Sequence, residues 1–296
     1  MVTKRKKINL APYLFIAPNF IGFLVFILIP VLVSLVVAFT DFNIFKGFAD
    51  SKFVGLDNFI QMFSDEWFQA ALKNNIIYTV VTIPIILGCS IIMATILNDK
   101  VYCRTAIRVM IFIPYISSVV AISVIWMLIL NPSQGILNNF LRAIGIANPP
   151  GWLGDPQWAL PSVIIVGIWM GLGYNTIIYM SGLQSVSKDL YEAAKIDGAS
   201  GLQLFRFITV PMLRNTTFFL LITNIISSFQ VFGQINIMTG GGPGTATTVL
   251  AHYIYLAGFR YHKMGYASAM AWFLLLILFL VTVFQWKIQR KHEDDM

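Results

Sequence analysis

Residues 74–97 read NNIIYTVVTIPIILGCSIIMATIL, twenty-four residues without an Asp, Glu, Lys, Arg or His. A helix needs about 20 predominantly apolar residues to cross the ~30 Å hydrocarbon core of a bilayer. The stretch therefore predicts a transmembrane helix. Five further uncharged runs in the chain are also long enough to span. The six predicted spans are approximately residues 12–40, 74–97, 109–130, 158–182, 215–238 and 266–286.

The composition indicates that much of the chain contacts lipid. The 296 residues are 57% hydrophobic and only 11% charged, whereas soluble domains carry about 25% charged residues. Without a large polar segment, the sequence predicts an all-α integral membrane protein with six transmembrane helices in a single domain over residues 1–296. The first run is too long for one upright span, and Pro18 and Pro30 predict an interfacial piece that leads into a kinked helix.

The positions of Lys and Arg predict the orientation. With the N-terminus inside, fourteen of the twenty basic residues fall in inner segments and six in outer loops. Cytoplasmic loops carry the excess of Lys and Arg, so both termini and the loop at 183–214 are expected to be cytoplasmic. This bias and anionic lipid headgroups account for the net charge of +7. Because no aromatic residues interleave with the basic ones, nucleic-acid binding is excluded.

The spans exclude several kinds of chemistry. No Asp, Glu, Lys, Arg or His lies within any of the six runs, and such intramembrane residues normally mark proton relays and ion coupling. This argues against a proton-coupled transporter, although a Na⁺ site built from carbonyls and hydroxyls stays possible. There is no buried carboxylate pair, no His to activate a nucleophile and no HExxH motif. We therefore predict no catalytic residue and no metal site, with a membrane enzyme acting through a loop as the remaining enzymatic alternative.

The sequence also contains no signature of nucleotide binding. The glycine run at 240–244 lacks the Lys-Ser/Thr of a phosphate loop and is interpreted as a tight turn, and no GxxxxGK[ST] occurs anywhere in the chain. If the protein moves a solute uphill, the energy must arrive from another chain.

The loop between spans four and five is longer than a minimal helix connection. It is predicted to form two short helices, Lys188–Ile196 and approximately Leu202–Val210. Ser187 is placed as the N-cap of the first helix, and Gly198 as the left-handed residue that follows it. Pro211 is expected to mark the break before the fifth span. Composition alone leaves two interpretations, an amphipathic hairpin on lipid headgroups and an element that docks on a partner.

A motif in this loop carries a family resemblance. Residues 192–199 read EAAKIDGA, and an F-x-x-I-x-x-P pattern follows at 205–211. The loop resembles the EAA loop of permease subunits from binding-protein-dependent ABC importers, where it is the coupling helix that seats in a groove of the cytosolic ATPase. The resemblance implies a coupling role for Leu190, Tyr191, Glu192, Ala193, Ala194, Asp197, Gly198, Ala199, Phe205, Ile208 and Pro211.

The resemblance extends along most of the chain. Ala17-Pro18, the segment 53–59 (FVGLDNF), Asn74-Asn75 and the glycine run at 240–244 are similar to the carbohydrate-uptake branch of the family. Within it the chain looks like the six-span permeases for sugars and glycerol phosphate. It departs from the maltose-type relative, which has extra N-terminal spans and a large periplasmic insertion.

The resemblance implies a non-catalytic permease of the bacterial inner membrane that imports an oligosaccharide or sugar derivative. The implied partners are a second, dissimilar permease, two cytosolic ATPase subunits that bind ATP and Mg, and an extracytoplasmic solute-binding protein. No cofactor is expected in this chain. A permease for another solute, such as a polyamine or peptide, and a secondary transporter without an ATPase are the alternatives. The sequence names neither the sugar nor the ATPase.

Polar residues in span five suggest a solute path. Thr223, Ser227, Gln230 and Gln234 lie within about 60° of one another on a regular helix. Such a stripe faces protein or a wet cavity, and sugars bind through hydrogen bonds and stacking on rings. The alternative is that these groups only hold helices together. The further candidates for the path are Tyr174 and Asn175 and the rings of Trp126, Trp169, Phe229 and Phe232.

The predicted orientation can be tested with single cysteines. Because of the excess of inner basic residues, cysteines at Lys52, Asn148 and His262 should react with an impermeant thiol reagent added outside sealed cells. Cysteines replacing Lys6, Lys195 and Lys291 should not react. Labelling of position 195 from outside would contradict the orientation.

Overall fold

The computed structural model describes residues 11–45, 47–48, 50–98 and 102–293, and its regular elements there are helices apart from two isolated β-bridges. Lys4 to Lys7, Lys46 and Lys100, which the charge count used, lie outside the described residues. The chain divides into two compact units, one formed by the described residues up to Phe63 with Ile254–Phe273, the other by Ser64–Tyr253 and the residues from Leu274. That they form one domain stays a prediction.

The first unit begins with a long apolar helix. It comprises α1 (Ala11–Phe23), a π-helical segment η1 (Leu24–Leu28) and α2 (Ile29–Ala38), without a break between them. The expected interfacial piece is therefore not a separate helix. Proline normally clashes with the carbonyl four residues earlier, but the wider π turn that ends two residues before Pro30 lets the helix continue.

Side-chain hydrogen bonds connect the helices of the first unit. The Asn58 amide in α3 (Asp57–Ser64) donates to the carbonyl oxygens of Ala38 (2.8 Å) and Thr40 (2.9 Å) at the end of α2. The Trp272 indole of α15 donates to the Ser34 hydroxyl at 3.1 Å. Helix α3 is a short helix in the loop that follows the first predicted span. The unit also contains η4 (Leu256–Arg260) and the first part of α15 (Met264–Glu293).

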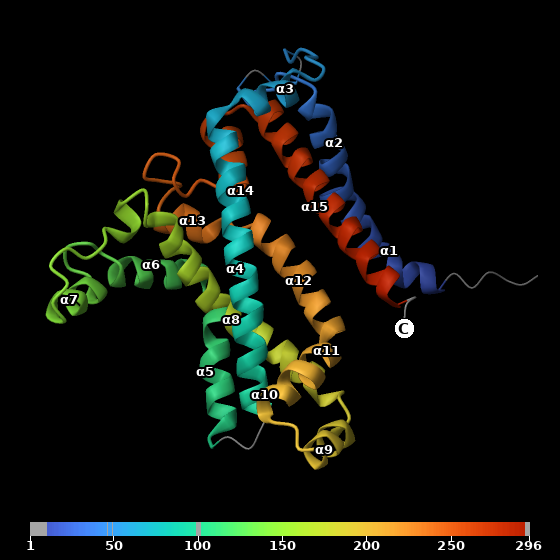
Figure 1. Ribbon diagram of the computed structural model, residues 1–296. Helices are drawn as coiled ribbons and strands as arrows, with labels where there is room; N and C mark the ends of the chain where they lie inside the picture. Colours follow the sequence, from blue (N-terminus) through green and yellow to red (C-terminus); the bar gives the residue numbers. More distant parts are fainter. Residues whose placement is uncertain (1–10, 46, 49, 99–101, 294–296) are drawn as a thin grey trace, which may run out of the picture. The chain divides into compact units, whose positions relative to one another are not determined.

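The second unit is built around two long helices that run side by side, α4 (Glu66–Asn98) and α8 (Ala159–Gln184), with α5 packed along α8 (Figure 1). Its remaining elements are α5 (Arg104–Ile116), α6 (Val119–Ile129), α7 (Ile136–Ala143), η2 (Trp152–Gly154), α9 (Lys188–Ile196), α10 (Gly201–Leu204), η3 (Phe205–Thr209), α11 (Val210–Met212), α12 (Arg214–Phe229), α13 (Gly233–Met238) and most of α14 (Leu250–Tyr255).

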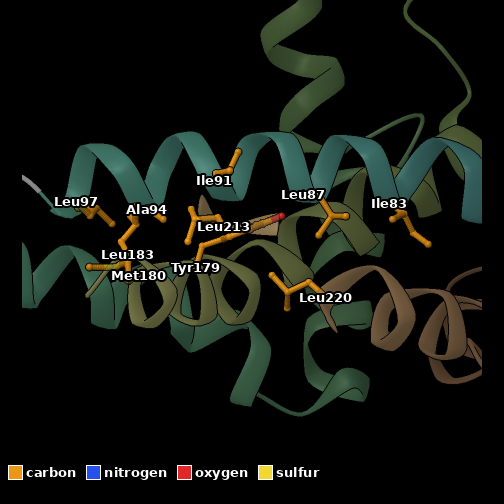
Figure 2. Close-up of a cluster of buried hydrophobic side chains, with 10 residues drawn as sticks. All are labelled: Ile83, Leu87, Ile91, Ala94, Leu97, Tyr179, Met180, Leu183, Leu213 and Leu220. Carbon is orange, nitrogen blue, oxygen red and sulfur yellow. The ribbon is translucent and has the colours of Figure 1, made fainter. Parts of the chain in front are cut away.

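A buried cluster joins α4 to α8 and to the start of the fifth predicted span. Figure 2 shows the α4 side chains spaced by three or four residues, so that they form one stripe facing the other helices. Between helices in a bilayer, such packing is stabilised by dispersion contacts rather than by removal from water. The cluster consists of Ile83, Leu87, Ile91, Ala94, Leu97, Tyr179, Met180, Leu183, Leu213 and Leu220.

Two predicted spans are interrupted. The third consists of α5 and α6, which are bent by 98° at Ser117-Ser118, so the prediction of one helix over 109–130 is wrong. The Ser117 backbone is extended (ψ 156°), and its hydroxyl bonds the Ile113 carbonyl oxygen at 2.7 Å. The fifth is interrupted between α12 and α13. An apolar run does not reveal such breaks, because hydropathy is the same on either side of them.

The membrane assignment is confirmed at the level of five to six spans. Within the described residues, five helical segments, one of them α12 together with α13, are long and apolar enough to cross a bilayer, and the bent α5–α6 pair would make six. Helix α4 starts eight residues before the uncharged run, because a helix can continue past the hydrocarbon where charged residues begin. The five are Leu14–Ala38, Glu66–Asn98, Ala159–Gln184, Arg214–Met238 and Met264–Lys287.

The packing of α5 on α8 predicts the effect of one methyl group. A Cβ at Gly173 would overlap the Ile111 carbonyl oxygen and lie 2.8 Å from the Phe112 Cα, whereas nothing lies within 4 Å of a Cβ at Gly88 in α4. Gly173→Ala should therefore force two backbones apart and cost about 1–3 kcal/mol. Gly88→Ala should be neutral or stabilising by up to about 1 kcal/mol.

The comparison can be made from the thermal unfolding midpoints of the two purified proteins in detergent. A Gly173→Ala protein that unfolds at the wild-type temperature would contradict the close approach of α5 and α8.

Candidate functional site

The first short helix of the loop between spans four and five forms as predicted. Helix α9 spans Lys188–Ile196, and the Ser187 hydroxyl accepts a hydrogen bond from the Asp189 backbone N–H at 3.2 Å. Gly198 is left-handed (φ +80°), with nothing within 4 Å of where a Cβ would be. The Ala199 N–H bonds the Ala194 carbonyl oxygen at 2.9 Å, which closes the helix. A glycine is therefore favoured at position 198 because the backbone is left-handed there, and not because a Cβ would lack room.

The second short helix is longer than predicted. It starts at Gly201 with a capping box between Ser200 and Gln203 and continues through η3 to Met212. The expected break at Pro211 is wrong, because the chain leaves helical geometry at Leu213. Pro211 follows a π turn by two residues, as Pro30 does, and is accommodated in the same way.

Helix α9 has one face toward its own chain and one toward the outside. The Tyr191 hydroxyl lies 3.1 Å from the Thr209 hydroxyl, and Ala194 is half-buried. In contrast, Leu190 is 42% and Ile196 87% exposed. The Leu190 and Ile196 side chains are therefore turned away from the contacts that Tyr191 makes. Both stripes of the helix carry apolar residues, so the sequence could not indicate which one faces inward.

The other predicted loop residues are also divided between half-buried and exposed positions. Phe205 packs against the buried cluster of α4 and α8, and Ala199 and Ile208 are half-buried. Leu202, which the sequence did not select, is 77% exposed. A cavity of about 560 Å³ lies between the loop and the ends of α4 and α8. The predicted residues that are exposed are Glu192, Ala193, Asp197, Gly198 and Pro211.

A second cavity, of about 410 Å³, lies among the helices of the second unit, and we call it the central cavity. It is lined by residues of α4, α5, α6, α8, α12 and α13 and of the break between the last two. Its volume falls within the ~300–1,000 Å³ typical of small-molecule sites. Six of the residues predicted for the path line it: Tyr174, Asn175, Thr223, Ser227, Phe232 and Gln234.

The other predicted path residues lie elsewhere. Gln230 is exposed and does not line the cavity, because α12 ends at Phe229 and the regular helix that placed it on the stripe is interrupted. Trp126 and Trp169 are not lining residues, and their rings contact each other edge-on, 5.6 Å apart. Phe229 is buried and also absent from the lining.

An amide pair connects α8 to α12 at the wall of the central cavity. Asn224 donates to the Asn175 Oδ1 at 2.7 Å, and Asn175 donates to the Gly171 carbonyl oxygen at 2.8 Å. Asn224 also donates to the Leu220 carbonyl oxygen at 2.7 Å. Asn175 is buried, and its amide is fully engaged within the protein. For this residue the geometry favours the alternative in which it holds helices together.

The sequence analysis did not select several cavity residues, among them Tyr115, Tyr78 and Thr82. Tyr115, in the last turn of α5, stacks on Tyr174 with ring centroids 4.7 Å apart and planes at 18°. Tyr78 and Thr82 lie one helical turn apart on α4 and also line the cavity, and Tyr78 donates to Gln234 at 3.4 Å. Polar groups spaced by four residues in an apolar run were the signal that could have indicated them.

The glycine run at 240–244 is part of an ordered loop anchored to α4. Asn74 donates to the carbonyl oxygens of Thr245 (2.7 Å) and Thr248 (2.9 Å). Asn75 donates to the Ser228 carbonyl oxygen (3.1 Å) and accepts from the Leu250 N–H (3.2 Å). The prediction of a tight turn therefore describes only a small part of this ordered loop. Within α14, which follows the loop, burial lowers the pKa of His252.

In the part of the chain that the structure describes, no group of three or more His, Cys, Asp and Glu side chains could hold a metal ion.

Comparison with known proteins places the chain in a family. The profile of the family described as "Binding-protein-dependent transport system inner membrane component" matches residues 75–293. The lactose transport system permease protein LacF of Rhizobium radiobacter is 37% identical over 95% of this chain and 94% of its own length.

Two solved structures are also similar over nearly the whole chain. One is a bacterial alginate ABC transporter in complex with an alginate pentasaccharide-bound periplasmic protein (TM-score 0.83, 27% identity, 95% of this chain and 94% of that one). The other is described as a bacterial ABC transporter involved in the import of the acidic polysaccharide alginate (TM-score 0.83, 28% identity, 95% of both chains).

A helical membrane subunit with a loop of two capped short helices and an internal cavity is the form expected of a transporter permease. This chain belongs to the family of inner-membrane components of binding-protein-dependent transport systems. It is the permease subunit of a binding-protein-dependent ABC importer, a multi-pass protein of the bacterial inner membrane that performs no catalysis. ATP is bound by the ATPase partner of such subunits, and the permease itself holds no cofactor.

The amide pair at the cavity wall predicts different outcomes for two polar residues. Asn175→Leu should leave the Asn224 amide without its partner and destabilise the protein by about 1–3 kcal/mol. Gln230→Ala removes an exposed side chain outside the cavity and should change stability by less than about 0.5 kcal/mol.

Thermal unfolding and the yield of monodisperse protein in detergent would measure both effects. Equal stability of the two variants would show that the pair does not hold α8 to α12.

Proposed function

We propose that this chain forms one half of the solute path of an ATP-driven carbohydrate importer, with residues 1–296 acting as one transmembrane domain. The central cavity carries the proposal, because it combines an apolar and aromatic wall with a few hydroxyl and amide groups. This is the composition of sites that bind small polar molecules. The names of the relatives support the solute class, since one is a lactose permease and another an alginate importer.

In this proposal the other half of the path comes from a second, dissimilar permease, and two cytosolic ATPases bind ATP and Mg. A solute-binding protein docks on the outer face, as the bound periplasmic protein of the alginate transporter suggests. Both termini are cytoplasmic. This orientation follows from the excess of inner Lys and Arg, and it places the loop at 183–214 on the side where ATP is hydrolysed.

The outward face of α9 is the surface we assign to the ATPase. Leu190, Ala193 and Ile196 are exposed there, and the small Ala193 permits close approach. Glu192, also exposed, offers a carboxylate to a basic or N–H partner at the rim.

The inward face of α9 transmits the displacement to the spans. Tyr191 is tied to Thr209 at the base of the second short helix, and Phe205 of that helix packs on the α4–α8 cluster. The first contact joins the two short helices of the loop, and the second attaches the loop to α4 and α8, which also line the central cavity. A push on α9 is therefore converted into a tilt of those helices rather than into bending of the loop.

A permease for a polyamine is less compatible with this cavity. A polyamine carries several positive charges, and the lining found in the described residues contains no Asp or Glu to balance them. Family membership also sets aside a secondary transporter that works without an ATPase.

The coupling role of the loop is tested by changing its turn. Gly198→Val places a β-branched residue at φ +80°. The left-handed conformation then costs roughly 1–2 kcal/mol, which shifts the equilibrium away from the native loop conformation about tenfold. We expect the variant to insert normally but to lose most of the stimulation of ATP hydrolysis by loaded binding protein. Gly201→Ala is the matched control, because nothing lies within 4 Å of its Cβ and its φ is not positive.

Glu192→Lys, a change on the exposed face, should also reduce stimulation without affecting insertion. The readouts are co-purification with the ATPase and the ratio of stimulated to basal ATP hydrolysis in proteoliposomes. Wild-type coupling in both Gly198→Val and Glu192→Lys would reject the assignment.

A further inference from the structure

The walls of the central cavity carry no formal charge. Among the described residues that line it, the polar groups are hydroxyls and amides, and none is an Asp, Glu, Lys, Arg or His. A charged solute held among spans must exchange its hydration for compensating groups of opposite charge. Such groups are missing from this wall, so an ionised solute would be disfavoured on it.

The relatives do not decide the charge of the solute. Lactose, named for one relative, is neutral, whereas the alginate named for another is described as acidic. The relatives therefore include both chemistries, and the charge of the solute is inferred from the lining of the cavity.

The N-terminus of α6 is the feature of the cavity that most favours an acidic solute. The helix begins at Val119, which lines the cavity, so its positive end lies at the wall. A helix N-terminus corresponds to about half an elementary charge. An acidic oligosaccharide carries one full charge per sugar, and one such terminus without a cationic side chain does not balance it. The same N–H groups suit the hydroxyl oxygens of a neutral sugar.

Thr82 supplies the second observation. It lies on α4, lines the cavity and is only 4% exposed, yet its hydroxyl has no hydrogen-bond partner in the described part of the chain. Neighbouring hydroxyls are occupied: Thr79 and Ser228 bond each other at 2.8 Å, and Thr223 bonds the Phe219 carbonyl oxygen at 3.0 Å. A buried polar group without a partner is unfavourable. The Thr82 oxygen has almost no accessible surface, so a rotation of its side chain toward the cavity would give it a polar molecule as a partner.

The aromatic wall is consistent with the same class of solute. The Tyr115–Tyr174 stack and Phe232 present apolar surface to the cavity. A sugar ring has C–H groups that can lie against such surface and hydroxyls that need partners such as Thr82.

We infer that the central cavity is selective for an uncharged, polyhydroxylated solute, a neutral oligosaccharide rather than an acidic one, and that the Thr82 hydroxyl forms one of the hydrogen bonds that hold it. This inference rests on the proposed function, because it assigns the solute class of the same path.

The test uses the complete transporter in proteoliposomes with its binding protein. The probes are radiolabelled neutral trisaccharides (arabinotriose, galactotriose and cellotriose) and trigalacturonate, and the binding protein's affinity for each is measured separately. We expect ATP-dependent uptake of at least one neutral probe. Trigalacturonate should not be imported even where the binding protein holds it. Import of trigalacturonate at a rate comparable to the neutral probe would overturn the charge selectivity.

The role of Thr82 is tested with isosteric variants. Thr82→Val should lower the amount of neutral solute imported per ATP hydrolysed about tenfold, the effect of losing one hydrogen bond, while stimulation of ATP hydrolysis by loaded binding protein persists. Thr82→Ser keeps the hydroxyl and should restore uptake. Thr282→Val in α15 is the control, because the Thr282 hydroxyl already bonds the Leu278 carbonyl oxygen at 2.7 Å.

The failures are distinguishable. If no carbohydrate probe is imported or stimulates ATP hydrolysis, the proposed function itself is wrong. If a neutral probe is imported but Thr82→Val matches Thr282→Val, or Thr82→Ser fails to restore uptake, the carbohydrate function stands and the assignment of Thr82 is wrong.

Discussion

A bilayer tolerates irregular backbone only where it is buried in protein or lines a wet cavity, because lipid cannot satisfy free N–H and C=O groups. This chain has two such interruptions within its predicted spans, at Ser117-Ser118 and at Gln230–Phe232. Val119 follows the first directly, and Phe232 belongs to the second. Both line the central cavity. The constraint therefore connects the unusual local structure to the site: the helices break where the cavity lies.

The unbroken helices serve the opposite purpose. Helices α4 and α8 pack along most of their length, and the cluster between them reaches Leu213, where the second short helix of the loop meets the fifth span. Phe205 packs on the same cluster. A rigid pair of helices thus has the proposed path at its middle and the proposed coupling loop at its end, which is the arrangement that a transmitted displacement requires.

The sequence predicted the parts of this structure that depend on composition and local chemistry. Uncharged runs located the spans, Ser187 located the start of α9, and Gly198 located its left-handed end. It failed where the outcome depends on a neighbour. Nothing local distinguishes Tyr191, which finds Thr209, from Leu190, which finds no contact that buries it. Pro211 would be expected to break the helix, but a π turn accommodates it.

The candidate path shows the same division. Tyr174, Thr223 and Ser227 line the cavity, and all three lie on regular helix, where helical spacing can be extrapolated. Gln230 does not line it, because a helical stripe cannot be extrapolated through a break. Thr82 and Tyr115 come from spans two and three. Their proximity to span five depends on the tertiary structure, which the pattern of a single helix does not reveal.

The central claim is that the cavity is a solute path whose access is controlled by the ATPase. The most direct measurement places a cysteine at Ser227 in a protein in which Cys89 and Cys103, both free and exposed, are replaced by serine. The reconstituted transporter is treated with an impermeant thiol reagent from the outer side, with and without nucleotide trapped by vanadate. The account predicts that trapping nucleotide changes the rate of modification and that transported solute slows it. A rate unaffected by both nucleotide and solute would contradict the account.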